Sequence, residues 1–161
     1  MRRRLVLAAF LALALPAGAG EPAFPKPAPR DLCPVCGMVV GKYPAWVATV
    51  VYKDGHAHHF DGAKDLFKYL FDVPRYARGH RADDIARIGV TEYYELKRID
   101  ARQAWFVIGS EVTGPMGHEL IPLASRADAE EFLRDHQGRR ILRFNEVGKE
   151  IPAKLDAGRF D

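Results

Sequence analysis

The sequence lacks the motifs of several common enzyme classes and has few cysteines to cross-link a small scaffold. Cysteine occurs only twice in 161 residues, which excludes a disulfide-rich framework. It has no glycine-rich phosphate loop, no G-x-S-x-G elbow and no H-E-x-x-H helix, and nothing in it resembles a catalytic triad. We therefore do not expect the chain to be an enzyme of these classes.

Long hydrophobic runs are also missing. The apolar stretch Leu5–Leu15 is too short to span a bilayer, which needs roughly 20 residues. It follows Arg2–Arg4 and precedes Ala17-Gly18-Ala19, the pattern of a secretory signal at 1–19 that is cleaved after Ala19. An uncleaved anchor is the alternative. The sequence thus predicts export, and no cysteine lies near the cleavage site to carry a lipid.

Excess charge is absent once this signal is set aside. The formal net charge of +3 equals the three arginines of the signal, which contains no acidic residue. The remaining chain is therefore formally neutral. We expect no basic surface for nucleic acid or anionic membrane.

The first half of the remaining chain predicts a small mixed structure. Residues 20–30, rich in proline and alanine, are typical of an extended tether. A domain is predicted over 31–147. Its first part, about 31–100, has predicted strands at 46–52, 56–60 and 93–99, a turn at 53–55, a helix at 63–71 and an irregular segment at 74–87. Asp61 is placed to cap the helix.

The second half repeats this order of elements. Between about 101 and 147, strands are predicted at 105–109, 118–123 and 141–144, with a helix at 126–135 that Ser125 caps. The fold class is α+β, with two similar ββαβ units packed together; coincidence of the two patterns is the alternative. The segment 148–161 is expected to be a partly disordered tail.

The sharpest motif is Cys33-Pro34-Val35-Cys36-Gly37-Met38, which places two thiols and a thioether within six residues. Soft sulfur ligands favour Cu(I) over harder divalent ions. A structural zinc site requires four ligands, with a second CxxC or a histidine pair at short spacing, and we do not expect one here. A metal site, a local disulfide and a redox-active pair fit the spacing about equally well.

The methionines tip this balance toward a metal site. After the signal only Met38 and Met116 remain, and each stands beside a glycine in a predicted loop. A loop methionine is usually a gap-filling or exposed side chain. Two such residues, one of them beside the cysteine motif, indicate thioether ligands.

Histidines and carboxylates are the other candidates. His118 follows Met116 by two residues and is a further possible ligand. His56 and His58 share a strand face, where a solvated hairpin is the simpler interpretation, and His80 is expected on the surface without a companion. Asp61 and Asp65 are four residues apart, and we interpret them as a helix cap and an exposed side chain.

Taken together, these motifs resemble the NosL family of nitrous oxide reductase accessory proteins. The resemblance rests on the cysteine motif, on residues 60–70 (FDGAKDLFKYL) and on residues 114–122 (GPMGHELIP). It implies a periplasmic chaperone that binds Cu(I), with Cys36, Met38 and Met116 as ligands. It also implies a fold of two ββαβ units like that of organomercurial lyase. Cys33 ranks below Cys36, because family members vary at that position.

The resemblance implies a client as well. That client is nitrous oxide reductase or a related copper enzyme, reached through the membrane-associated Nos assembly complex. Many family members are lipoproteins, whereas this sequence shows no lipidation cysteine. A thiol–disulfide oxidoreductase acting through Cys33 and Cys36 is the second hypothesis, and an interaction module with a structural disulfide is the third.

Overall fold

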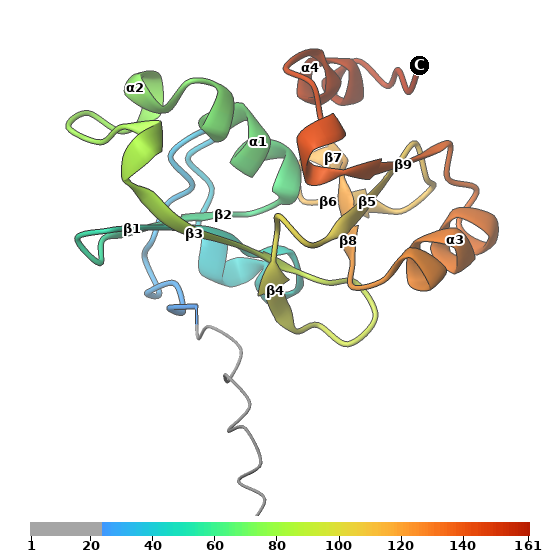
Figure 1. The fold of residues 1–161 in the computed structure, drawn as a ribbon, viewed down its shortest axis with the longest axis horizontal. Coiled ribbons are helices and arrows are strands. Elements are labelled where there is room, and N and C mark those ends of the chain that lie inside the picture. The colour runs from blue at the N-terminus through green and yellow to red at the C-terminus, as the bar shows by residue number, and fades with distance from the viewer. Residues whose placement is uncertain (1–23) are drawn as a thin grey trace, which may run out of the picture.

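A computed structural model describes residues 24–161, so the predicted signal at 1–19 and residues 20–23 lie outside the described part. The N-terminal part is an antiparallel sheet with the order β2-β1-β3-β4. Its elements are η1 (Val40–Lys42), η2 (Pro44–Trp46), β1 (Ala48–Tyr52), β2 (Ala57–Phe60), α1 (Ala63–Phe71), α2 (Val73–Tyr76), η3 (Ala82–Asp84), β3 (Ile85–Thr91) and β4 (Arg98–Asp100). Figure 1 shows α1 above one face of this sheet.

The C-terminal part contains a second antiparallel sheet, with the order β8-β5-β9, and a two-stranded ribbon, β6-β7. Its elements are β5 (Trp105–Ile108), β6 (Thr113–Gly114), β7 (Gly117–His118), β8 (Ile121–Leu123), α3 (Arg126–Asp135), β9 (Arg140–Arg143), η4 (Phe144–Glu146) and α4 (Glu150–Asp156). In each large sheet the first strand pairs with its hairpin partner and with the strand after the helix. The α+β class is confirmed, and both parts share this order of elements.

Strand β5 contributes to the hydrophobic cores of both parts, because side chains on both of its faces are buried. Phe106 and Ile108 belong to the cluster that contains α1, whereas Val107 belongs to a second cluster under α3. Side chains alternate between the faces of a strand, so this separation follows from the sequence period of two. The ring of Phe67 on α1 packs edge-on to Phe106, with 5.3 Å between centroids. The core of α1 is therefore shared between both parts.

Several predicted elements need correction. The segment 74–87, expected to be irregular, contains α2, η3 and the start of β3. The strand predicted at 93–99 is mostly the loop between β3 and β4, in which the N–H of Glu92 bonds to Lys97 O, and only its last two residues belong to β4. The Ser125 cap is confirmed, since its hydroxyl accepts the N–H of Asp128 at 3.1 Å.

The expected disorder of 148–161 is wrong. This segment forms α4, whose apolar side chains Ile151 and Leu155 are buried against the larger core. Their spacing of four residues places both on one helical face. The error arose because that face spans only two turns and is surrounded by charged residues. Among the described residues no helix has the length and apolar character needed to span a membrane.

Candidate metal centre

The cysteine motif forms a closed turn in front of the sheet. The N–H of Cys33 bonds to Met38 O at 2.8 Å, and the N–H of Gly37 bonds back to Cys33 O at 2.8 Å. Gly37 has a φ of +79°, in the left-handed region that favours glycine. A bridge between Leu32 and Val39 closes the base of the turn. The backbone thus holds both thiols on the same side of the loop.

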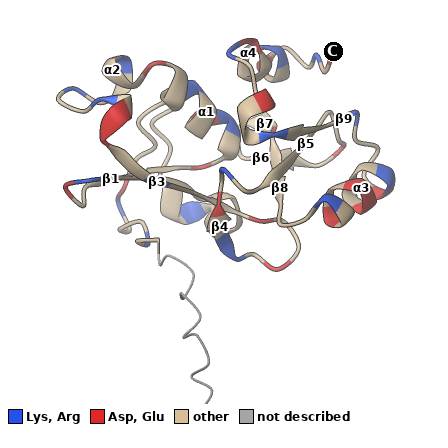
Figure 2. Ribbon diagram, viewed as in Figure 1, with Lys and Arg blue, Asp and Glu red and all other residues tan. Residues whose placement is uncertain are grey.

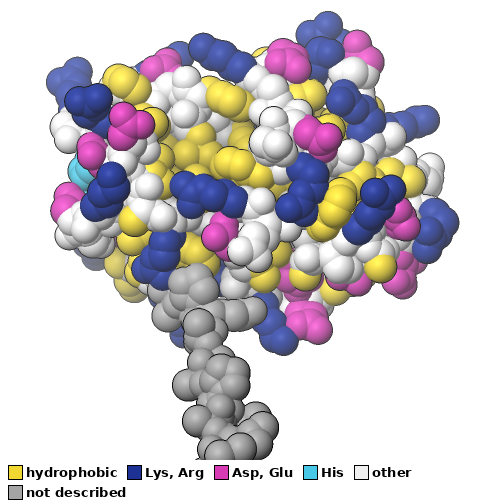
Figure 3. Space-filling model, viewed as in Figure 1, with side chains coloured by type: hydrophobic (Ala, Val, Ile, Leu, Met, Phe, Trp, Pro, Cys, Tyr) yellow, Lys and Arg dark blue, Asp and Glu magenta, His cyan; other side chains and the backbone are white. Residues whose placement is uncertain are grey.

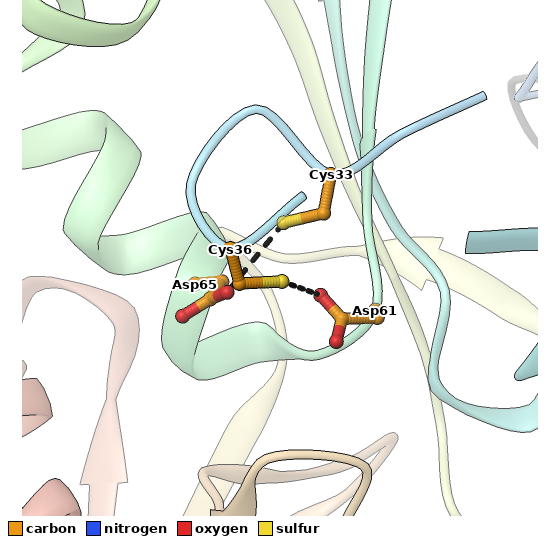
Figure 4. A group of neighbouring side chains, drawn as sticks. All are labelled: Cys33, Cys36, Asp61 and Asp65. Carbon is orange, nitrogen blue, oxygen red and sulfur yellow. Dashed lines mark hydrogen bonds between the residues drawn. The ribbon is translucent and has the colours of Figure 1, made fainter. Parts of the chain in front are cut away.

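Two aspartates face these thiols. The Sγ atoms of Cys33 and Cys36 and one carboxylate oxygen each of Asp61 and Asp65 all lie within 4.8 Å of one another. Cys36 Sγ donates to Asp61 Oδ1 at 3.2 Å, and Cys33 Sγ donates to Asp65 Oδ2 at 3.5 Å (Figure 4). Both cysteines are free thiols. The turn and the start of α1 therefore build a single group of four donors.

The prediction that Asp61 caps α1 is wrong, and the residue that caps the helix instead explains why Asp61 faces Cys36. The N-cap of α1 is Gly62, and no side chain of the cap bonds to the helix. Instead the carboxylate of Glu119, from the second part of the chain, accepts the N–H of Lys64 at 2.8 Å. A Cβ on Gly62 would lie 2.8 Å from Glu119 Cδ, so glycine permits this approach. With the helix capped from elsewhere, Asp61 points to Cys36.

The expected exposure of Asp65 is also wrong. Asp61 and Asp65 are 1% and 2% exposed. Asp65 Oδ1 lies 3.1 Å from Lys68 Nζ, which supplies a compensating charge. Asp61 Oδ2 is buried without a hydrogen-bond partner among the described residues. A buried carboxylate oxygen without a partner is costly, and a bound cation would satisfy it.

Burial controls the protonation of both thiols. Burial raises the pKa of Cys33 to about 12, against a smaller lowering by the backbone N–H groups of Cys36 and Val35. Burial also raises the pKa of Cys36, and the hydrogen bond to Asp61 raises it further. Without a cation the thiols are therefore protonated at neutral pH. A cation that displaces both protons gains two thiolate ligands.

Met116 contacts α1 through its backbone. It occupies the turn between β6 and β7, and its carbonyl oxygen accepts from Lys64 Nζ at 2.7 Å. Lys64 immediately precedes Asp65 on α1, and its buried ammonium also lies 3.0 Å from Asp156 Oδ1 on α4. Figure 2 shows the basic positions of α1 and the charged residues of α4. The side chain of Met116 is 43% exposed, so it stands at the surface.

The other predicted ligands are placed less centrally. Met38 is half-buried, and its backbone N–H lowers the pKa of Cys36. His118 lies on β7, where its ring packs edge-on to Phe160, with 4.8 Å between centroids. Its Nδ1 is buried without a partner among the described residues. His118 is not among the four residues whose ligand atoms converge.

This arrangement changes one conclusion drawn from spacing alone. A zinc site was disfavoured for want of four ligands, yet Cys33, Cys36, Asp61 and Asp65 are four donors of the kinds that zinc accepts. Local sequence could not show this, because the aspartates were assigned to the helix terminus. The choice between metals therefore depends on the softness of the donors and on the two methionines.

The fold and this group of side chains define a small α+β protein with a candidate metal centre of two thiols and two carboxylates. The chain belongs to the NosL family, whose model matches residues 25–152.

Two relatives show how far the likeness extends. The copper-binding lipoprotein NosL of Stutzerimonas stutzeri is 29% identical over 127 residues, which is 75% of this chain and 64% of the relative. The chain thus spans less than two thirds of that protein's length. The crystal structure of the copper chaperone NosL from Shewanella denitrificans matches with a TM-score of 0.66 and 26% identity, over 79% of this chain and 96% of that one. Both relatives are named for copper rather than for a catalysed reaction.

Proposed function

We propose that this protein is a periplasmic copper carrier, not an enzyme, which binds Cu(I) between the cysteine turn and the first turn of α1. The observation that carries the proposal is the convergence of Cys33 and Cys36 with Asp61 and Asp65 within 4.8 Å. The copper-related names of both relatives support it. The predicted signal at 1–19 supports export to the periplasm.

The proposed ligands are the sulfur atoms. Cys36 is the anchor, with Cys33, Met38 and Met116 as further donors, because Cu(I) prefers thiolates and thioethers to carboxylates. His118 is the least supported ligand, since its ring faces Phe160. In this scheme Asp61 and Asp65 hold the thiol protons in hydrogen bonds before the metal arrives, and those protons leave to solvent as Cu(I) binds.

Release requires no change of oxidation state. Met116 is exposed and lies beside α1, so a partner's ligand can replace it first and reach the ion stepwise. The proposed client is nitrous oxide reductase or another copper enzyme, and the proposed route is the membrane-associated Nos assembly complex. Family membership supports this client.

The oxidoreductase alternative is disfavoured by the thiols themselves. A redox-active pair needs a thiolate, usually produced by a pKa of about 3.5–7.5. Here burial raises the pKa of Cys33 to about 12, and the carboxylates nearby disfavour further negative charge. Such thiols attack a disulfide slowly unless a cation first removes their protons.

Competition for Cu(I) tests the proposal. The reduced protein is titrated anaerobically against a chromophoric Cu(I) chelator, and we expect one ion bound per chain. Cys36→Ser should abolish tight binding and Cys33→Ser should weaken it, while Ser110→Ala, which alters a hydroxyl in the loop after β5, should change nothing. Zinc is titrated in parallel. Zinc affinity equal to Cu(I) affinity, or no Cu(I) bound, would refute the carrier proposal.

A further inference from the structure

A second group of potential ligands lies at the far end of the β1–β2 hairpin. His56 and His58 come from this hairpin, and His80 comes from the loop after α2. The ring centroids of His56 and His58 are 4.8 Å apart, those of His56 and His80 5.2 Å, and those of His58 and His80 6.1 Å. Three of the six histidines of the chain thus gather at one point, and His80, expected to have no companion, has two.

From this cluster we propose a second metal site, at which His56, His58 and His80 bind a divalent ion that prefers imidazole, Cu(II) or Zn(II). A metal–nitrogen bond of about 2.0–2.1 Å places the ion roughly 3.2 Å from each ring centroid. Three rings at tetrahedral angles then have centroids about 5 Å apart. Two of the observed separations match this value, and the third is longer by about 1 Å.

The nitrogens themselves must rotate toward a common point. Among the described residues, only the cysteine–aspartate group has ligand atoms that already lie within 4.8 Å of one another. His56 is exposed and its ring has room to turn, whereas the ring of His80, 22% exposed, packs against that of Tyr52 at 4.0 Å between centroids. His58 is also held, beside the Tyr69 ring at 5.5 Å between centroids. These two therefore serve as the more fixed ligands, to which His56 adjusts.

The charged groups around the three histidines favour a bound metal ion over protonation of all three rings. Asp54 Oδ2 lies 3.4 Å from His80 Nε2, and Asp54 Oδ1 accepts the backbone N–H of His56, not its ring, at 2.9 Å. A carboxylate in this position orients a ligating imidazole and balances the ion's charge. Protonated histidines would repel one another here: burial first, then His56 and His80, lower the pKa of His58 to about 4. The imidazole of His58 is thus neutral and able to bind a metal.

The site opens to solvent. A hollow of about 160 Å³ beside it is lined by residues of the hairpin and of the loop, among them Asp54, His80 and Asp84. A small histidine surface is visible at the left edge of Figure 3, the edge at which the β1–β2 turn and the loop after α2 both lie in Figure 1. Asp61 of the first site follows the other end of β2, so the two groups occupy opposite ends of one strand.

The test removes the thiols so that only the histidines can bind. The variant with Cys33→Ser and Cys36→Ser is titrated with Cu(II), and its fold is checked by circular dichroism. Electron paramagnetic resonance should report several imidazole nitrogens at one bound ion. His80→Gln in this background should lower the affinity about tenfold or more and remove one nitrogen from the spectrum. His136→Gln, a histidine on another surface, should have no effect.

Two results would overturn the proposal. Absence of a Cu(II) or Zn(II) complex, or an affinity that His80→Gln leaves unchanged, would show that the rings only pack together. If the double serine variant does not fold, Co(II) is added to the wild-type protein instead. Absorption bands of bound Co(II) that appear without a thiolate-to-metal charge-transfer band then identify the histidine site. Their persistence in His80→Gln would likewise refute it. This site is independent of Cu(I) binding at the cysteines, so either can fail alone.

Discussion

Replacement of Met116 by leucine separates a copper carrier from a thiol enzyme most clearly. Leucine has a similar volume, and such exchanges usually cost less than about 1.5 kcal/mol even in a core. The side chain of Met116 is 43% exposed, so the cost here should lie well below that limit. At about 3 °C per kcal/mol for a chain of this size, the melting temperature should fall by only a few degrees. The carbonyl that accepts from Lys64 is unchanged by the substitution.

The metal should respond quite differently. Loss of one sulfur donor should weaken Cu(I) binding about tenfold or more, equivalent to at least ~1.4 kcal/mol. The assay pairs thermal melting with anaerobic chelator competition on the same samples. Leu96→Ser, which alters another exposed apolar side chain, is the negative control. Met38→Leu should weaken Cu(I) binding in the same sense. Unchanged Cu(I) affinity in a folded Met116→Leu protein would remove Met116 from the site.

Gly62→Ala should displace the Glu119 carboxylate, lower the free energy of unfolding by about 1–3 kcal/mol in urea and weaken Cu(I) binding. Gly41→Ala should do neither, because the nearest atom to its added Cβ is Ala28 O at 3.9 Å, an ordinary van der Waals contact. Cu(I) affinity should rise with pH, because protons compete for the thiols. Since the pKa of Cys33 is raised to about 12, the rise should continue beyond pH 9, whereas an ordinary thiol would level off near 8.5; a plateau at 8.5 would contradict the burial of the site. Leu155→Ala should cost about 2–5 kcal/mol, and no change in the melt would mean that α4 is not packed.

The secondary structure could be predicted from the sequence wherever one local pattern dominated. The helix at 63–71 was predicted with the observed ends, because Leu66, Phe67 and Leu70 repeat at helical spacing. The strand partner of the first hairpin was likewise predicted, with a small shift at its end, whereas the strand predicted at 118–123 divides into β7, which pairs with β6, and β8, which pairs with β5. Helix α4 was missed because two buried positions among charged neighbours give too weak a pattern.

The candidate site was only half readable from sequence, for a different reason. The sulfur residues are rare and stand out, so Cys33, Cys36 and Met116 could be chosen directly. Asp61 precedes a helix, where a cap is the simpler explanation, and nothing near it in sequence shows that Glu119 performs that task. Glu119 takes the capping role expected of Asp61 from a distant position in the sequence, and no local sequence pattern reveals such a contact. The pairing of His80 with the hairpin was hidden in the same way.

The cap that Glu119 gives to α1 has a consequence for any attempt to exchange parts between relatives. Gly62 lies in the unit that contains the first large sheet and Glu119 in the unit that contains the second, yet they meet at the turn that directs Asp61 and Asp65 toward the thiols. A chimera that joins the first unit of one protein to the second unit of another should assemble a working centre only when both halves of this contact are inherited together. Crossovers between the units would otherwise yield folded sheets without a competent site.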